Sequence, residues 1–310
     1  MIINTGCRTD IPAFYSKWFM NRIKEGFVLV RNPYYKTQVT KYSLSPNVVD
    51  CLAFCTKNPK PMLKYLSKLD KYNQFWFVTI TPYGKDIEPF VPKKDEVIES
   101  FKILSNHLGV DAVNLRYDPI FINEEFDVKK HIECFEDIVK KLKGYTKSCT
   151  ISFLDLYEKV KKNAPDLRPP TKEEKIEIAK AFSKIGLENG MVVHACCEEN
   201  FLENYGLKCN GCMSKENVEK AINYKLKPIK KGNLRKKCNC LMGSDIGAYN
   251  TCGHLCKYCY ANFDKKTVIN NMKLHDENSP LLIGNINKYD KITNADQRSF
   301  IVNEQISFFI

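Results

Sequence analysis

The chain has 310 residues, of which 44% are hydrophobic and 27% are charged, and its formal net charge is +12. This composition predicts a folded protein with a substantial core. No segment approaches the roughly 18 consecutive apolar residues of a membrane span, and the first ten residues lack the basic and apolar regions of a secretion signal. We therefore expect a cytoplasmic protein without a membrane partner.

The first 200 residues alternate between short apolar segments and longer amphipathic segments that carry lysines. We predict strands at residues 1–4, 49–54, 74–80, 110–117, 148–155 and 191–197. We predict helices between them at residues 11–26, 59–69, 93–109, 128–144 and 173–190. Almost entirely apolar strands are typical of a sheet covered on both faces, and their alternation with helices indicates right-handed βαβ units. The predicted fold class is α/β, a partial (β/α)6 barrel of the TIM type, with a doubly wound parallel sheet as the alternative.

The alternation stops after about residue 200, where cysteine and lysine become frequent. We predict three regions: a barrel at residues 1–205, a cysteine-rich segment at 206–262 and a C-terminal extension at 263–310. The apolar residues 306–310 are expected to dock this extension onto the barrel.

Polar side chains follow the predicted strands, at the edge where catalytic residues of parallel barrels collect. The candidates for substrate contacts are Asp10, Arg116, Asp118, Asp155 and Glu198. The candidates for cofactor contacts are Thr81, Tyr83 and His194. Carboxylates at such an edge suit a substrate with paired N–H donors, such as a guanine-like base. The alternative is a structural role, for example a salt bridge between Arg116 and Asp118.

The chain contains 14 cysteines, and disulfides are rare in the reducing cytosol. Four of them form a C-x2-C pair and a C-x-C pair: Cys209, Cys212, Cys238 and Cys240. Together these four thiolates are candidates for a zinc or auxiliary iron–sulfur site, and the alternative is a set of reduced, partly buried thiols. Cys196 and Cys197 are adjacent, so on a strand they are expected to face opposite sides.

Three further cysteines, Cys252, Cys256 and Cys259, lie in the stretch "YNTCGHLCKYCYAN" with the spacing C-x3-C-x2-C. A structural zinc site needs four ligands, usually from two cysteine pairs. Three thiolates on a [4Fe–4S] cluster instead leave one iron without a protein ligand, so that a small molecule can bind it. The spacing therefore favours a cluster over zinc. His254, inside the stretch, is expected to face solvent.

The same stretch resembles the cluster-binding loop of the radical S-adenosylmethionine superfamily, whose pattern is C-x3-C-x-aromatic-C, with Tyr258 as the aromatic residue. The resemblance implies that Cys252, Cys256 and Cys259 bind a [4Fe–4S] cluster and that Tyr258 packs beside the nucleoside of S-adenosylmethionine. It also implies reductive cleavage of S-adenosylmethionine, abstraction of a substrate hydrogen, and a reducing partner such as flavodoxin or ferredoxin.

The position of the loop departs from that superfamily, in which the loop follows the first strand. A late cluster loop resembles a bacterial family known as DUF1848. The matching stretches are "FCTKNP" (54–59), "RYDPI" (116–120) and "DIGAYNTCGHLCKYCYAN" (245–262), which are spread over most of the chain.

The resemblance to radical S-adenosylmethionine enzymes implies a lyase, and the expected substrate is queuine. A lyase of queuosine salvage cleaves queuine to 7-aminomethyl-7-deazaguanine, and the acidic edge described above suits a deazaguanine. One alternative is a radical lyase or repair enzyme that acts on nucleic acid, which the charge of +12 would favour. Another is a zinc-stabilised nucleic-acid-binding protein that uses the basic residues 225–237 and the aromatic residues of 258–263.

Overall fold

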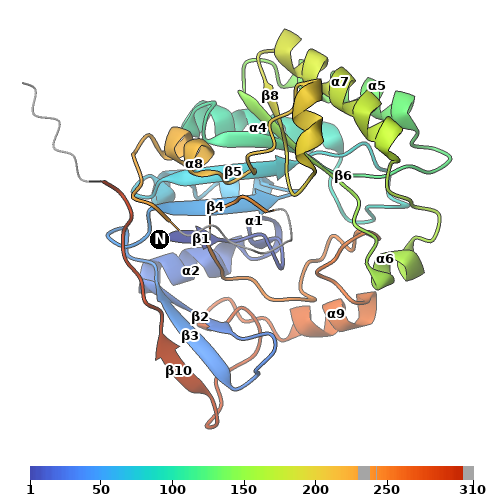
Figure 1. The fold of residues 1–310 in the computed structure, drawn as a ribbon. Coiled ribbons are helices and arrows are strands. Elements are labelled where there is room, and N and C mark those ends of the chain that lie inside the picture. Colours follow the sequence, from blue (N-terminus) through green and yellow to red (C-terminus); the bar gives the residue numbers. More distant parts are fainter. Residues whose placement is uncertain (230–237, 242, 303–310) are drawn as a thin grey trace, which may run out of the picture.

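Seven parallel strands form the central sheet of the protein (Figure 1). This computed structural model describes residues 1–229, 238–241 and 243–302. The strands run in the order β8-β7-β6-β5-β4-β1-β9. Their bounds are β1 (Ile2–Asn4), β4 (Cys51–Thr56), β5 (Gln74–Thr79), β6 (Val113–Ile120), β7 (Ser148–Phe153), β8 (Val192–Ala195) and β9 (Ser244–Asp245). All six predicted strands are confirmed, and β9 is an additional short strand beside β1.

Helices follow these strands where the amphipathic pattern predicted them. After β1 and β4 come α1 (Ile11–Phe14), α2 (Ser16–Glu25), α3 (Lys60–Leu63) and the 3-10 helix η1 (Leu66–Leu69). After β5, β6 and β7 come α4 (Lys94–Leu108), α5 (Val128–Lys141), α6 (Glu158–Asn163) and α7 (Lys172–Glu188). A capping box fixes the start of α7, because the side chains of Thr171 and Glu174 each accept a hydrogen bond from the other's backbone N–H.

The order of the strands tests the two predicted folds. From β1 through β4 to β8, each strand of this sheet lies parallel to and beside the previous one. A doubly wound sheet would reverse its order near the middle, so that alternative is wrong. Among the described residues, β8 and β9 are the outermost strands, β8 forms a further bridge with Lys208, and the sheet does not close into a barrel. The fold is therefore α/β with a large parallel sheet.

The two faces of the sheet are covered differently, because alternate strand residues point to opposite sides. One face packs against the helices in the main core and includes Leu52, Phe54, Trp76 and Val78. The opposite face, called the inner face below, includes Ile2, Cys51, Ala53, Phe75 and Phe77. Helix α8 (Lys215–Ile222) and the cysteine-rich segment cover this apolar half of the inner face.

The inner face becomes polar on β6, β7 and β8. Leu115 on β6 and Ile151 on β7 face the main core, so their neighbours Arg116 and Thr150 face inward. Arg116 is paired in register with Thr150, and Thr150 with His194 on β8. Polar inner residues near the ends of parallel strands are where a ligand site is expected in such folds.

A second, three-stranded sheet joins two segments that are far apart in the sequence. β2 (Phe27–Arg31) and β3 (Gln38–Ser43) form an antiparallel hairpin, and β10 (Lys291–Asn294) pairs with β3 in parallel. Figure 1 shows β10 beside this hairpin, with helix α9 (Lys265–Lys273) between it and the cysteine loop in the chain. None of these strands was predicted. The predicted docking segment 306–310 lies outside the described residues.

Phe54 provides a test of the main core. Its ring is fully buried and stacks on that of Trp76, with 4.1 Å between centroids. Because Phe54→Ala leaves a cavity, we expect the free energy of unfolding to fall by about 3–5 kcal/mol in urea denaturation. Leu187→Ala is the control: Leu187 is 69% exposed on α7, and its loss should change the free energy of unfolding by less than about 0.5 kcal/mol. Equal effects of the two substitutions would contradict this description of the core.

Candidate functional site

The cysteine loop, residues 251–262, lies across the C-terminal ends of the strands. His254 contacts Asp10, which follows β1, and Tyr258 contacts Glu88, which follows β5. Functional groups of parallel α/β proteins collect at this edge of the sheet. The loop therefore reaches the predicted edge although it follows all six predicted strands in the chain.

The three loop thiols influence one another electrostatically, and Cys259 and Cys256 both help to raise the pKa of Cys252. Cys252, Cys256 and Cys259 are each partly buried. In the described part of the chain, their sulfur atoms do not form a group lying within 4.8 Å of one another. A single tetrahedral zinc would need such a group, because Zn–S bonds of about 2.3 Å hold two sulfurs about 3.8 Å apart. Burial raises the pKa of all three thiols, so metal binding here has to displace their protons.

Tyr258 anchors the loop to a buried carboxylate. Its side chain is only 8% exposed, and its hydroxyl donates to Glu88. The same Glu88 oxygen accepts from the hydroxyl of Thr81 at 2.7 Å and from Lys57 Nζ at 2.9 Å. Tyr258 and Thr81, the residues expected to contact S-adenosylmethionine, thus share one buried carboxylate through their hydroxyls. Burial alone would raise the pKa of Glu88, but Lys57 and the two hydroxyls outweigh it and lower that pKa.

Asp10 holds the other end of the loop. One carboxylate oxygen caps α1 by accepting from the N–H of Ala13 at 3.0 Å. The other accepts from the N–H of Lys57 at 2.8 Å and lies 3.0 Å from His254 Nε2. His254 is 2% exposed, and its Nδ1 lies 3.2 Å from the carbonyl oxygen of Phe90. The expectation that His254 faces solvent is wrong, and Asp10 helps to position the loop.

The side chain of Tyr83 packs against Tyr258 in the protein interior. It is buried and stacks on Phe121 with 4.2 Å between ring centroids. Its hydroxyl donates to the carbonyl of Pro119 at 2.6 Å, and its ring meets the Tyr258 ring edge-on at 5.9 Å. Tyr83, a residue expected to contact the cofactor, thus packs against the aromatic residue of the cysteine loop.

Arg116 and Asp118 form an ion pair at the inner face. Arg116 Nε donates to Asp118 Oδ2 at 2.7 Å, and Ser152 donates to the other oxygen of Asp118. Burial opposes the charge of Arg116, but Asp118 and nearby thiols raise its pKa well above the usual value. Those thiols include Cys196 and Cys212. The salt bridge left open as the structural alternative is therefore present.

The remaining predicted edge residues form their hydrogen bonds with groups outside the cysteine loop. Glu198 accepts from the N–H of Phe153 at 2.9 Å, and burial raises its pKa. His194 lies on β8 with Nδ1 3.1 Å from the side-chain oxygen of Asn210, and burial lowers its pKa. Asp155 is exposed in the turn that follows β7. These residues line the same edge but are engaged with their own neighbours.

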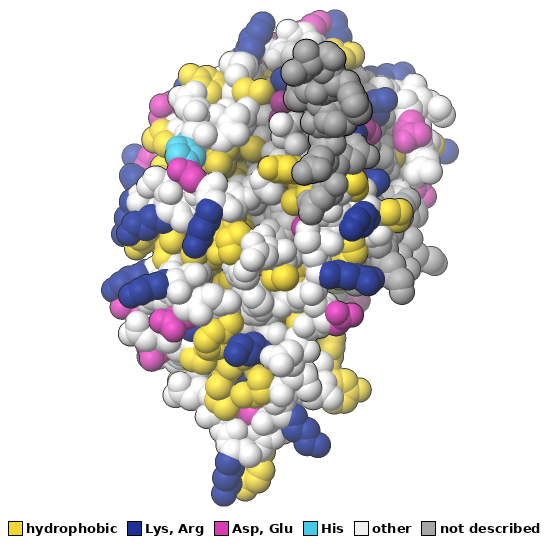
Figure 2. All heavy atoms as spheres, turned by 90° about the vertical axis from the view of Figure 1, so that its left-hand side faces the viewer, with side chains coloured by type: hydrophobic (Ala, Val, Ile, Leu, Met, Phe, Trp, Pro, Cys, Tyr) yellow, Lys and Arg dark blue, Asp and Glu magenta, His cyan; other side chains and the backbone are white. Residues whose placement is uncertain are grey.

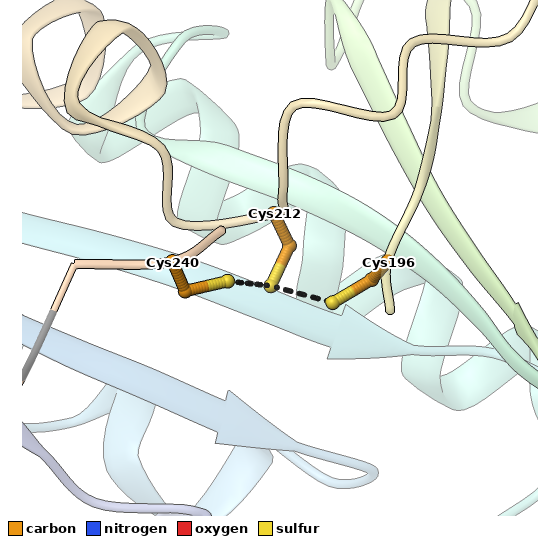
Figure 3. Close-up of side chains that lie close together, drawn as sticks. All are labelled: Cys196, Cys212 and Cys240. Carbon is orange, nitrogen blue, oxygen red and sulfur yellow. Dashed lines mark hydrogen bonds between the residues drawn. The ribbon is translucent and has the colours of Figure 1, made fainter. Parts of the chain in front are cut away.

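A second group of thiols meets at the inner face (Figure 3). The sulfur of Cys212 lies 3.4 Å from that of Cys196 and 3.4 Å from that of Cys240, and Figure 3 shows the three side chains converging from separate segments. Cys238 lies two residues before Cys240 in the chain. Cys209 was predicted as the partner of Cys212, but its sulfur lies 3.7 Å from the carbonyl of Glu199 and packs into the main core. Cys196 therefore replaces Cys209 in the predicted set.

Cys197 lies close to this group because β8 is shorter than predicted. The strand ends at Ala195, and Cys197 adopts a φ of 62°. Its sulfur consequently lies 3.8 Å from that of Cys196. The expectation that the two thiols face opposite sides of a strand is wrong.

The comparison with protein families matches most of this architecture. A family model described as a domain of unknown function, DUF1848, matches residues 2–261. The chain belongs to the DUF1848 family. The matched residues include the central sheet, both groups of thiols and the cysteine loop up to Ala261. No curated protein and no solved structure matches the chain.

The surface of this DUF1848 protein bears on the nucleic-acid alternatives. On the face in Figure 2, lysine and arginine side chains are interspersed with acidic and hydrophobic ones and do not form a single basic stripe. Most of the basic stretch 225–237 lies outside the described residues. Tyr258, one of the proposed stacking residues, is buried. No described helix combines the length and apolarity needed to span a membrane.

Two central residues of the site, Lys57 and Glu88, were not among the predicted substrate, cofactor or metal contacts. Lys57 follows β4 directly, within the stretch "FCTKNP" that resembles the DUF1848 family, so its position was a usable signal. Glu88 lies in the irregular segment between β5 and α4, and no local pattern distinguishes it. Only the folded chain brings Glu88 to Lys57 and Tyr258.

Glu88→Gln tests whether this carboxylate holds the loop. The substitution leaves Lys57 buried without a counter-charge, so we expect the free energy of unfolding at neutral pH to fall by about 3–5 kcal/mol. Since the folded protein lowers the pKa of Glu88, its stabilisation is present above the ordinary glutamate pKa of about 4.3 and is lost as pH falls through the lower folded value. Denaturation at several pH values should show the difference between Glu88→Gln and wild type shrinking in acid.

Two variants control this experiment. Adding Lys57→Met removes the unpaired cation and should recover most of the lost stability. Glu99→Gln breaks the exposed ion pair with Lys102 and should change stability by less than about 1 kcal/mol. A Glu88→Gln variant as stable as Glu99→Gln would mean that the buried pair is not required.

Proposed function

We propose that this protein is a radical S-adenosylmethionine enzyme whose [4Fe–4S] cluster is held by Cys252, Cys256 and Cys259. The observation that carries the proposal is that the C-x3-C-x2-C loop lies across the C-terminal edge of a parallel sheet, where Asp10 and Glu88 hold it. A cubane engages three thiolates on three separate irons and leaves the fourth for a ligand. When bound, such a cluster supplies the electron that cleaves S-adenosylmethionine to a 5′-deoxyadenosyl radical.

The residues around the loop support this role because they hold the loop in place and provide a positive charge near its thiols. Glu88 holds Tyr258, and Asp10 holds His254, so the ligand-bearing turns are tied at two points. The ammonium of Lys57 interacts electrostatically with Cys256 and offers a cation beside an anionic cluster. For the finer fold, the sequential order of parallel strands supports a partial (β/α)6 barrel with this loop across its end.

The Arg116–Asp118 pair supports a deazaguanine as substrate. Among the described residues, the side chain of Arg116 makes one hydrogen bond, from Nε to Asp118, so its two terminal NH2 groups are available to a ligand. A guanine-like edge presents a carbonyl acceptor beside N–H donors, which an adjacent Arg and Asp complement. We therefore propose a cytoplasmic lyase of queuosine salvage that cleaves the C–N bond of queuine to release 7-aminomethyl-7-deazaguanine, with flavodoxin or ferredoxin as the electron donor.

Iron content and S-adenosylmethionine cleavage test the cluster. Protein reconstituted without oxygen should be brown, bind about four irons through the loop and form 5′-deoxyadenosine from S-adenosylmethionine after reduction. Cys256→Ala should lose 5′-deoxyadenosine formation, because it removes one of three ligands. Cys134→Ala, which removes a partly buried thiol of α5, should keep both properties. A colourless protein that binds zinc but no iron would refute the proposal.

Turnover of queuine tests the substrate. Arg116→Lys retains the charge but loses the planar fork, and loss of a charged hydrogen bond of about 1.5–3 kcal/mol corresponds to roughly a 10–100-fold fall in kcat/KM for queuine. Arg168→Lys is the matched control, because Arg168 pairs with Glu174 at an exposed site. Chromatography would measure 7-aminomethyl-7-deazaguanine. If S-adenosylmethionine is cleaved but this product does not form, queuine is ruled out as the substrate. Turnover of an oligonucleotide would favour the nucleic-acid alternative.

A further inference from the structure

The thiols at the inner face form a compact group that the proposed radical chemistry does not use. Cys196 follows β8, Cys212 precedes α8 and Cys240 precedes β9. Their three sulfurs lie within 4.8 Å of one another, and all three residues are buried. Three separate segments of the chain thus deliver three thiols to one point. Cys238 lies two residues before Cys240 and is the candidate for a fourth ligand.

The spacing of these sulfurs fits one metal ion. Two thiolates on a tetrahedral zinc lie about 3.8 Å apart, since each Zn–S bond is about 2.3 Å. The two sulfur–sulfur distances at Cys212 are 3.4 Å, which is close to this value. A cubane holds each thiolate on a different iron and spreads them further. The loop thiols, which are not all within 4.8 Å of one another, differ from the inner group in this respect.

The backbone around the inner thiols allows the two turns that carry Cys212 and Cys240 to pack closely together. The N–H of Met213 points at the sulfur of Cys240 at 3.4 Å, a contact that stabilises a thiolate. Gly211 has a φ of 89°, and a Cβ there would lie 3.1 Å from the carbonyl carbon of Asn239. Glycine at this position therefore allows the turn before Cys212 to pack against the turn that contains Cys240.

A cation also faces the group. The guanidinium of Arg116 interacts electrostatically with Cys196 and Cys212. A divalent ion with four thiolates carries a net charge of about −2, which is costly to bury without a counter-charge. Arg116 supplies one such charge from the neighbouring strand β6.

We propose that Cys196, Cys212, Cys238 and Cys240 bind a single zinc ion in a closed, structural site. Four protein ligands leave no open position, so the ion binds no substrate. It crosslinks the end of β8 to the cysteine-rich segment and holds that segment on the inner face. The site is independent of the cluster proposed for the loop, because the two share no ligand.

Zinc K-edge absorption spectroscopy of the full chain tests the site directly, because iron in the loop does not contribute at this edge. We expect four sulfur neighbours at about 2.3 Å and about one zinc per chain by mass spectrometry. The same zinc content is expected in a variant with Cys252, Cys256 and Cys259 all changed to Ala, which removes only the loop ligands. Nitrogen or oxygen neighbours, or iron retained in this variant in place of zinc, would overturn the proposal.

Single substitutions test the ligand set. Cys212→Ser and Cys240→Ser should each lower the zinc content at least tenfold after dialysis against a chelator. Cys209→Ser is the matched control, because Cys209 is equally buried and belongs to the same C-x2-C pair, and it should retain zinc. Cys238→Ser should lose zinc and Cys197→Ser should keep it; the reverse result would refute Cys238 as the fourth ligand. If the serine variants fail to fold, the zinc absorption spectrum of the unmodified chain still shows whether four sulfurs bind the ion.

Discussion

The winding of the central sheet is the constraint on which the rest of the structure depends. The strands β1 and β4 to β8 follow one another in a single direction, and their connecting helices pack on one face in the main core. Phe75 and Phe77 on the inner face are nonetheless as apolar as the residues that the helices cover. The chain after β8 must therefore cover this face, and α8 with the cysteine-bearing turns does so. The zinc site proposed here lies at that junction.

Two buried carboxylates hold the cysteine loop against the ends of the strands. Glu88 and Asp10 both follow strand ends, and each binds one end of the loop through Tyr258 or His254. A buried carboxylate is stable when a cation and hydrogen-bond donors compensate for its lost hydration. Lys57 serves both, because its side chain pairs with Glu88 while its backbone N–H binds Asp10. One residue after β4 thus couples the two anchors.

Local patterns in the sequence predicted the elements well and the contacts poorly. The apolar strands and amphipathic helices of residues 1–200 were predictable because their periodicity is local. The hairpin β2–β3 was missed, and so was its pairing with β10, whose Lys291 lies opposite Gln38. Spacing pointed to Cys209 as the partner of Cys212, but the sheet brings Cys196 there instead. No local pattern indicates the tertiary hydrogen bonds of Asp10, Tyr83 and Tyr258, because their partners are distant in the sequence.

The pairing of β9 with β1 has a consequence for how the chain is synthesised. β1 is made first, but its outer neighbour, with Ser244 opposite Ile3, comes more than 200 residues later. Until then the nascent sheet has an open strand edge and an uncovered apolar face, two features that promote aggregation. A chain that stops before the cysteine-rich segment would keep both features exposed, so β9 and the turns that bear Cys212 and Cys240 complete and cover the sheet.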